Sequence, residues 1–156
     1  MPTTMPPTIR EMTRDEAQAM LRGHHVGRIA YAFHDQVDIE PIHYVYDAGA
    51  IYLRTSPGSK LLTLRHNPWV AFEVDEVHGR HAWRSVVAHG TVYELRPTGT
   101  PADHRAYERA LLLLREQDPE ALTPADPAPW RTVLVQLAVD RLRGRVAHAA
   151  ERAASA

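Results

Sequence analysis

Short segments of alternating apolar and polar residues, separated by turn signals, constrain the fold of this chain most strongly. Residues 26–33 are typical, because Ile29, Tyr31 and Phe33 would share one face and Arg28 would lie on the other, as in a β-strand. The same criteria predict strands at residues 37–46, 50–54, 69–74, 83–95 and 133–139, with 141–147 as a seventh candidate. Few helices separate these strands, so the pattern favours a mostly β fold, a closed antiparallel barrel rather than a parallel sheet.

Three helices are expected beside the strands. Thr13 and Glu16 have the spacing of a capping box, which predicts a helix that starts there and stops near Gly23. Residues 60–66 form a short predicted helix before Asn67-Pro68, and residues 101–116 form a longer one. The helices are too few to alternate with the strands and are expected to flank the sheet.

Length and composition limit the classes of protein that fit. The 156 residues are typical of one domain, expected over residues 13–148 between a flexible leader (1–12) and a disordered tail (149–156). A net charge of -1 argues against a nucleic-acid partner, and the absence of cysteine excludes thiolate metal sites and a cysteine nucleophile. No apolar run approaches the roughly 18 residues of a membrane span, and no secretory signal is recognisable. We therefore expect a cytoplasmic protein without a membrane partner.

The loop after the third predicted strand carries the strongest chemical signal. Residues 54–60 place hydroxyl groups, a glycine, Arg54 and Lys60, the only lysine in the chain, at the start of a helix. Helix N-termini and charge-assisted hydrogen bonds from Lys and Arg suit a phosphate group. The sequence lacks the pattern of a Walker A loop, and a solvated surface turn capped by Ser59 is the alternative interpretation.

A family resemblance bears on this choice. The chain contains five informative stretches in order, namely Gly27–Ala30, Pro41–Tyr44, Ile51–Leu62, Arg65–Val74 and Trp83–Gly90. In combination they resemble the FMN-binding split barrel of the pyridoxamine 5′-phosphate oxidase-like superfamily, in its nitroimidazole-resistance-type branch. The resemblance covers roughly residues 13–146 and implies a six-stranded antiparallel split β-barrel of Greek-key type. It also implies a homodimer with two FMN sites formed between the subunits.

The resemblance further implies roles for individual residues. The segment Pro41, Ile42, His43 and Tyr44 would run beside the isoalloxazine ring. The ribityl chain and phosphate would be held by Arg54, Thr55, Ser56, Ser59 and Lys60. Trp83 and Ser85 would approach the flavin from the partner chain or cover the phosphate end. Cofactor-binding residues are thus expected on three separate stretches of the chain.

Two positions depart from the pattern of true pyridoxamine-phosphate oxidases. Those enzymes have an arginine immediately before the phosphate-loop lysine, where this chain has Ser59. They also have a histidine in a C-terminal substrate motif, where this chain has Arg143. Vitamin B6 oxidation is therefore not the expected activity.

His43 is the candidate catalytic residue. Strand alternation places it with Val37, Ile39 and Val45 on an otherwise apolar face, so the ring must either find a partner in the core or line a cavity. In a cavity it could donate a proton to a substrate, because histidine titrates near neutral pH. It would also be a candidate axial ligand if the chain bound haem. No spacing typical of a zinc site supports a metal.

Two classes of function remain. The first is an FMN-dependent oxidoreductase acting on a small molecule, with nitro compounds as a candidate substrate class. The second is a non-catalytic carrier or sensor of flavin, deazaflavin or haem. An absorbance spectrum would separate the chromophores, and reduction by NAD(P)H would separate an enzyme from a carrier.

Overall fold

The computed structural model describes residues 6–150. This part of the chain forms three helices and eight strands, which include all of the strands expected from the alternation. In chain order these are β1 (Thr8–Glu11), α1 (Arg14–Gly23), β2 (Val26–Phe33), β3 (Gln36–His43), β4 (Val45–Asp47), β5 (Ala50–Thr55), α2 (Ser59–His66), β6 (Trp69–Gly79), β7 (Ala82–Leu95), α3 (Pro101–Arg115) and β8 (Val133–His148). None of the described helices has the length and apolar character needed to cross a membrane.

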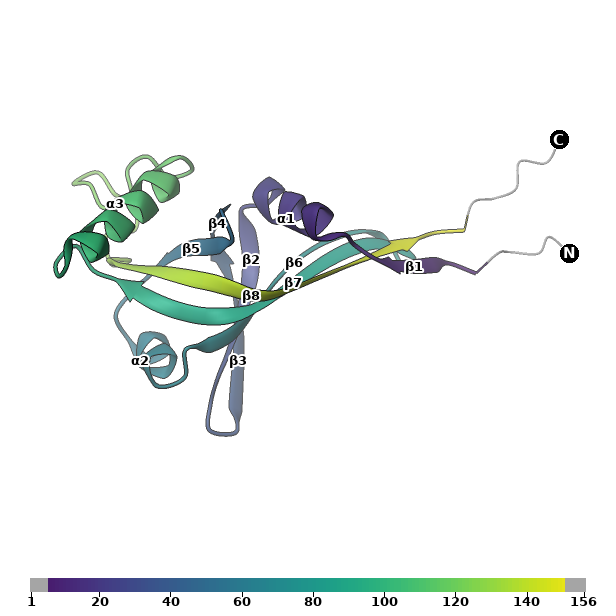
Figure 1. Cartoon of the computed structure of the whole chain (residues 1–156), viewed down its shortest axis with the longest axis horizontal. Helices are drawn as coiled ribbons and strands as arrows, with labels where there is room; N and C mark the ends of the chain where they lie inside the picture. The colour runs from purple at the N-terminus through teal and green to yellow at the C-terminus, as the bar shows by residue number, and fades with distance from the viewer. Residues whose placement is uncertain (1–5, 151–156) are drawn as a thin grey trace, which may run out of the picture.

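All pairings lie in one antiparallel sheet with the order β3-β2-β6-β7-β8-β5-β4, and β1 pairs with β8. The two strands at the ends of this order, β3 and β4, are consecutive in the chain and only Tyr44 separates them. The sheet therefore curls until its two edges meet at one residue, which is the split-barrel arrangement (Figure 1). The mostly β, antiparallel split-barrel fold with flanking helices is thus confirmed, although the sheet has eight strands in the described chain. The closed barrel favoured by the alternation is corrected, because the sheet is not closed.

Tyr44 is the residue at which the sheet splits. Its backbone N–H donates to the carbonyl oxygen of His25 (2.9 Å), and its hydroxyl donates to the carbonyl oxygen of Leu21 (2.7 Å). The ring is completely buried and meets the Phe72 ring edge-on, with centroids 4.8 Å apart. These contacts remove Tyr44 from the ladders, so the predicted single strand over residues 37–46 is in fact two strands.

The split also changes which residues face the core. Val37 and Ile39 on β3 are 74% and 67% exposed, and His43 is exposed as well, whereas Ile42 is buried. Val45 is buried because the break at Tyr44 restarts the alternation. The predicted face of Val37, Ile39, His43 and Val45 is therefore not one face of a strand. Pro41 lies on a strand at the end of the sheet order, as its missing donor predicted.

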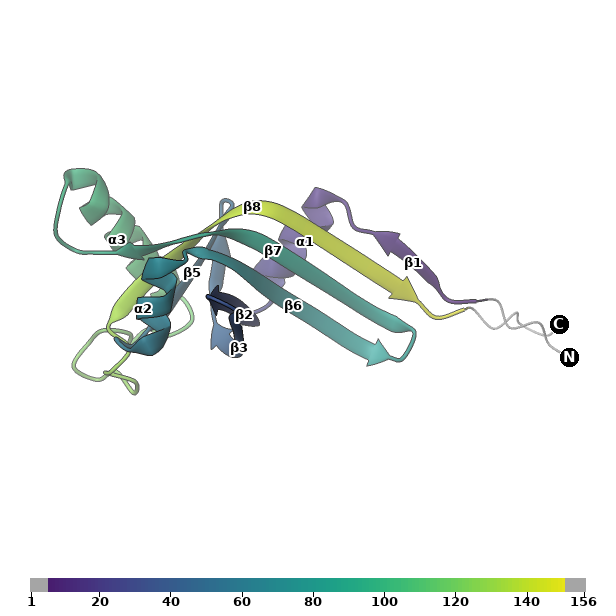
Figure 2. The same ribbon diagram turned by 90° about the horizontal axis from the view of Figure 1, so that it is seen from below.

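Three long strands extend the sheet to one side. β6 extends to Gly79 and β7 begins at Ala82, so both are longer than the predicted strands 69–74 and 83–95. Glu76 pairs with Arg84 across the two strands in the added part. The predicted strands 133–139 and 141–147 are one strand, β8, with a register shift opposite His89 and Gly90. Figure 2 shows β6, β7 and β8 side by side, with β1 along β8.

The expected leader is partly ordered. Thr8–Glu11 form β1 on β8, and the Met12 N–H donates to the Gly144 carbonyl oxygen (2.8 Å). A Cβ atom on Gly144 would lie 2.4 Å from the Met12 sulfur, so the close approach requires glycine. The sequence offered no alternation long enough to predict this strand. Residues 1–5 and 151–156, and with them most of the predicted tail, lie outside the described residues.

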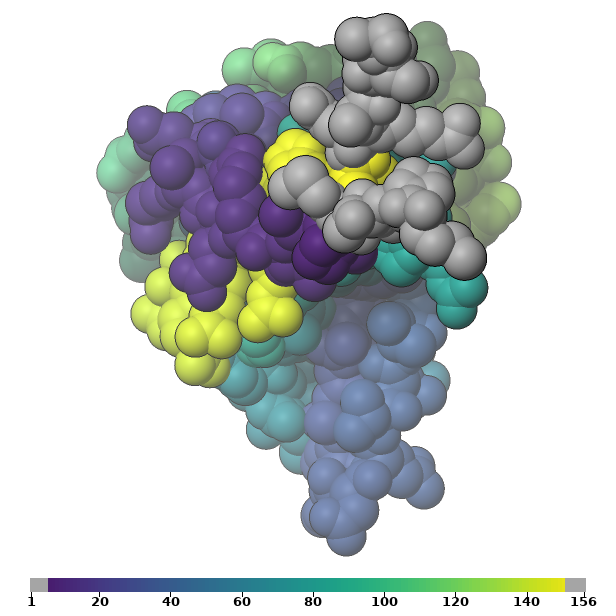
Figure 3. Space-filling model, turned by 90° about the vertical axis from the view of Figure 1, so that its right-hand side faces the viewer, coloured from purple at the N-terminus to yellow at the C-terminus, as the bar shows by residue number. Residues whose placement is uncertain are grey.

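Two apolar clusters hold the elements together. The larger lies between α1 and the curled sheet, and includes Leu21, Ile29, Ile51, Phe72 and Leu137. The smaller lies between α3 and β4, β5 and β8. The hairpin of β2 and β3 projects from this body (Figures 1 and 3). Residues of its strand β3 form one wall of the candidate site.

Candidate cofactor site

A hollow of about 390 Å³ opens beside the end of β5, and we call it the β3–β5 hollow. Its lining comes from the start of β2, from the end of β3, from the chain between the end of β5 and the first turn of α2, and from the segment that precedes β8. The lining residues are Val26, Glu40, Pro41, Ile42, His43, Arg54, Thr55, Ser56, Lys60, Trp130 and Arg131. Seven predicted cofactor-binding residues therefore lie around one space, namely Pro41, Ile42, His43, Arg54, Thr55, Ser56 and Lys60.

The turn into α2 brings Lys60 to this space. Gly58 precedes the helix with φ +157° and ψ -165°, a conformation that residues with a side chain rarely adopt. α2 then begins at Ser59, so Lys60 lies in its first turn. Thr55, the last residue of β5, is buried. The loop thus supplies a cation and hydroxyl groups at a helix N-terminus, a combination suited to a phosphate.

Lys60 is paired within the chain. Its ammonium group forms an ion pair with the carboxylate of Glu40 on β3, across the hollow. Sequence reasoning missed Glu40, because the pair depends on β3 lying beside the β5–α2 loop. A charged side chain next to Pro41 on a predicted strand was the only available signal.

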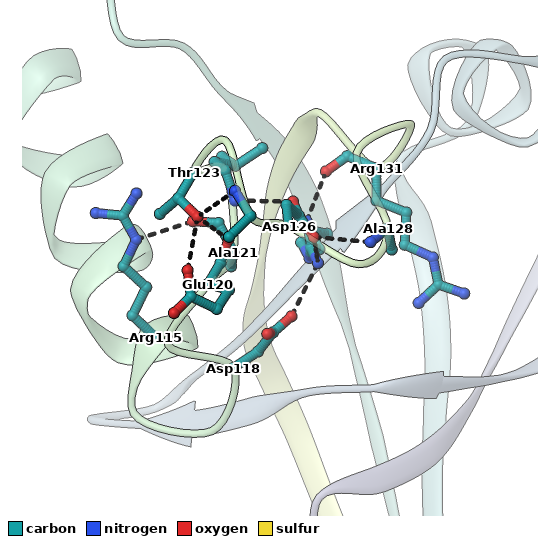
Figure 4. Close-up of polar contacts among 11 residues, drawn as sticks. Arg115, Asp118, Glu120, Ala121, Thr123, Asp126, Ala128 and Arg131 are labelled. Atoms are coloured by element: carbon teal, nitrogen blue, oxygen red, sulfur yellow. Dashed lines mark hydrogen bonds and ion pairs between the residues drawn. The ribbon is translucent and has the colours of Figure 1, made fainter.

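Arg54 forms more hydrogen bonds within the chain than Lys60 does. Its guanidinium donates to both carboxylate oxygens of Asp126 (2.6 and 2.9 Å), to Asp118 (2.9 Å) and to the Arg131 carbonyl oxygen (3.3 Å). Figure 4 shows this network around Asp126. The bond from Arg54 holds the pKa of Asp126 below its usual range, and the same bond raises the pKa of Arg54. Arg54 therefore fixes residues 118–131 to the sheet, a role that the sequence did not predict.

A second and larger hollow of about 940 Å³ lies next to the first, and we call it the α1–α3 hollow. It is bounded by the ends of α1 and α3, the β3–β4 junction and the segment 118–131. Three residues line both hollows: His43, Arg54 and Arg131. His43 therefore lines a cavity, as one of its predicted roles requires, and its cavity lies on the exposed side of β3.

Four predicted residues lie elsewhere. Ser59 does not line the β3–β5 hollow, and the Tyr44 ring belongs to the core, although Tyr44 also lines the α1–α3 hollow. Trp83 and Ser85 pair with Ala147 and Arg145 on β8, whereas Arg54 pairs with Leu134. Arg145 is eleven residues beyond Leu134, or about 36 Å along the strand. Trp83 and Ser85 of the same chain are thus remote from the hollow.

Comparison with known proteins assigns the chain to a protein family. The sequence model described as pyridoxamine 5′-phosphate oxidase matches residues 13–146, which is most of the chain. The chain belongs to the pyridoxamine 5′-phosphate oxidase family. The match covers all of the strands except β1 and the last two residues of β8, and therefore both hollows.

Individual proteins and solved structures resemble the chain over most of its length. An uncharacterized protein of Rhizobium meliloti is 29% identical and covers 92% of this chain and 98% of its own. The crystal structure of an FAD-binding protein from Mesorhizobium loti is 27% identical, with a TM-score of 0.71, covering 90% and 99% of the two chains. A protein from Bacteroides thetaiotaomicron, proposed to act in 5-nitroimidazole antibiotic resistance, shares the fold, with a TM-score of 0.69 at 16% identity over 92% and 90%.

Proposed function

We propose that this protein binds a flavin, with the flavin mononucleotide unit in the β3–β5 hollow and its phosphate at Lys60. The observation that carries the proposal is the lining of that hollow, where Lys60, Thr55 and Ser56 face the β3 segment that ends at His43. Family membership and the FAD-binding relative support it. We propose FMN as the cofactor. FAD contains the same unit, so the cofactor itself must be identified chemically.

The chain's own groups account for the binding. Lys60 would exchange its bond with Glu40 for one to the phosphate, and the hydroxyls of Thr55 and Ser56 would donate to phosphate or ribityl oxygens. β3 has no strand beyond it in the described sheet, so its backbone is free to lie against a flat ring. A bound flavin supplies hydride and electron transfer, while the protein supplies binding, orientation and access.

We further propose that the protein is an oxidoreductase acting on a small molecule, with nitro compounds as the first class to test. His43 lines both hollows and is exposed, so its imidazole could donate a proton to a substrate bound beside the flavin. The second candidate function is a carrier or sensor of flavin, deazaflavin or haem. It is favoured by the same position of His43, which would suit an axial ligand of haem iron.

A homodimer would complete the site. The apolar residues Val37 and Ile39 are exposed on β3, and Trp130 is 59% exposed at the β3–β5 hollow, so a second copy has apolar surface to cover. In such a dimer Trp83 and Ser85 of the partner could reach the hollow from which their own chain separates them. We expect an interface above roughly 1,000 Å². Sedimentation that finds a flavin-loaded monomer at micromolar concentration would refute the dimer.

The proposal is tested on freshly purified protein. We expect paired near-ultraviolet and blue absorbance bands, and chromatography of the cofactor released by acid should identify FMN or FAD. A single intense Soret band would favour haem and contradict flavin binding. Bleaching by NAD(P)H, followed by reoxidation with a nitro compound, would establish oxidoreductase activity. A flavin that resists both steps would favour the carrier.

A further inference from the structure

The α1–α3 hollow is large enough to bind a small molecule, and it is separate from the proposed site of the flavin phosphate. Its volume of about 940 Å³ lies in the upper part of the range of small-molecule sites, roughly 300–1,000 Å³. It shares a wall with the β3–β5 hollow through His43, Arg54 and Arg131. A ligand bound there would be a direct neighbour of the proposed flavin.

Internal contacts hold the walls of this hollow in place. Arg54 clamps the segment 118–131 through Asp118 and Asp126, and Asp126 also accepts the backbone N–H groups of Leu122 and Ala128 (2.8 and 2.9 Å). On the opposite side, the Gln117 amide nitrogen lies 2.7 Å from His25 Nδ1, which joins the ends of α3 and α1. A site with walls fixed in this way loses little entropy when it binds a ligand.

The lining combines an apolar wall with arginine side chains. The apolar part consists of Val45, Tyr46, Leu114, Ala121 and Pro127. The Arg22 guanidinium lies over the Tyr46 ring, 5.6 Å from its centroid.

The charged side chains on the lining differ in whether they already form ion pairs. Within residues 6–150, no carboxylate lies within ion-pair distance of Arg22 or Arg131. Figure 4 shows the Arg131 side chain turned away from Asp126. Of the two acidic lining residues, Asp118 is taken by Arg54, and only Glu116 remains.

We propose that the α1–α3 hollow binds an aromatic molecule that carries an anionic group, with its ring against Tyr46 and its anion on Arg22 and Arg131. Such a ligand could be the adenylate half of FAD or a separate aromatic acid that acts as substrate. The proposal rests on the proposed function for its role beside a flavin, but the binding itself needs only residues of this chain. The guanidinium groups of Arg22 and Arg131 would form charge-assisted hydrogen bonds with the anionic group, and the apolar wall would pack against the aromatic ring.

Matched pairs of probes test the charge and the source of the ligand. AMP is compared with adenosine, and 4-nitrobenzoate with 4-nitrobenzamide, by calorimetric titration of protein with and without FMN. We expect the anionic member of at least one pair to bind about ten-fold more tightly than its uncharged partner. A preference for AMP, together with tighter binding of FAD than of FMN, identifies the adenylate half of FAD. A preference confined to 4-nitrobenzoate identifies a separate aromatic acid.

Variants locate the site. Arg22→Gln and Arg131→Gln should each abolish the preference for the anion, whereas Arg105→Gln on the exposed face of α3 should retain it. Arg22 lines only the α1–α3 hollow, so its variant should keep the affinity for FMN. Anions that bind no better than their uncharged partners, or a preference that survives both variants, would overturn the proposal. Failure of FMN to bind would overturn only the proposed function, because the titrations on flavin-free protein test the hollow independently.

Discussion

Lys60 and Glu40 form an ion pair across the β3–β5 hollow, although twenty residues separate them in the chain. The Lys60 and Glu40 side chains are only 23% and 36% exposed, so an incoming phosphate would have to displace one carboxylate to reach the lysine. Glu40 would therefore compete with the flavin phosphate for the ammonium group of Lys60.

Glu40→Gln should strengthen FMN binding. The amide keeps the size of the side chain but removes the negative charge, and a partly exposed ion pair of this kind is worth about 0.2–1 kcal/mol. The dissociation constant should fall about two- to five-fold when FMN is titrated and its fluorescence followed. Weaker binding by this variant would mean that Glu40 helps to hold the cofactor rather than competing with it.

Arg54→Gln should destabilise the fold even without a cofactor. The change removes the cation from a network that fixes residues 118–131, and it leaves Asp126 buried beside a neutral amide. We expect thermal denaturation to occur at least about 5 °C lower, and earlier proteolysis within residues 118–131. Arg109→Gln, which breaks the exposed pair with Asp47, is the matched control and should change little. Unchanged stability with lost FMN binding would instead assign Arg54 to the phosphate.

Glu76 should make stability depend on acidic pH. Its bonds with Arg84 and then His24 lower the pKa from 4.5 to about 2 in the folded chain. A lowered folded-state pKa stabilises the protein above the unfolded value, so this contribution should be complete above about pH 5 and disappear as the pH falls towards 2. Urea denaturation across this range should show a shallower loss for Glu76→Gln than for the unmodified protein. Glu108→Gln, at an exposed position on α3, should retain the steep loss.

His43→Ala should leave folding intact, because the residue is exposed and outside the two apolar clusters. If His43 donates a proton to the substrate, turnover with a nitro compound should fall about 100-fold or more, with the flavin spectrum unchanged. Stopped-flow measurement of flavin reoxidation across pH 5–9 would separate this role from a structural one. Equal turnover at every pH would remove His43 from the reaction.

Local signals in the sequence predicted most of the fold. The capping box of Thr13 and Glu16 is present, and α2 and α3 lie within one residue of their predicted bounds. Each of these features depends on residues a few positions apart. The split at Tyr44 could not be predicted, because it depends on hydrogen bonds to Leu21 and His25. A short strand such as β1 likewise gains its order only from pairing with β8.

In the candidate site, too, some residues could be predicted from local sequence features, whereas others depend on the folded sheet. Lys60, Thr55 and Ser56 were predicted to lie together because the turn and the helix start are local features, and all three line the β3–β5 hollow. Glu40 and Asp126 were missed, because each meets its partner only after the sheet has curled. The exposed side of β3 was also misjudged, since alternation cannot tell which face of an edge strand is the core.

The dissociation constant of FMN for the Lys60→Ala variant tests the central claim most directly. We predict that flavin-free wild-type protein binds FMN and that the variant, folded by circular dichroism, binds it about 5- to 160-fold more weakly, as expected for one lost charge-assisted bond of about 1–3 kcal/mol. Arg65→Ala, at the far end of α2 and outside the β3–β5 hollow, should retain wild-type affinity. Equal affinity of the wild-type protein and Lys60→Ala for FMN would contradict the placement of the flavin phosphate in the β3–β5 hollow.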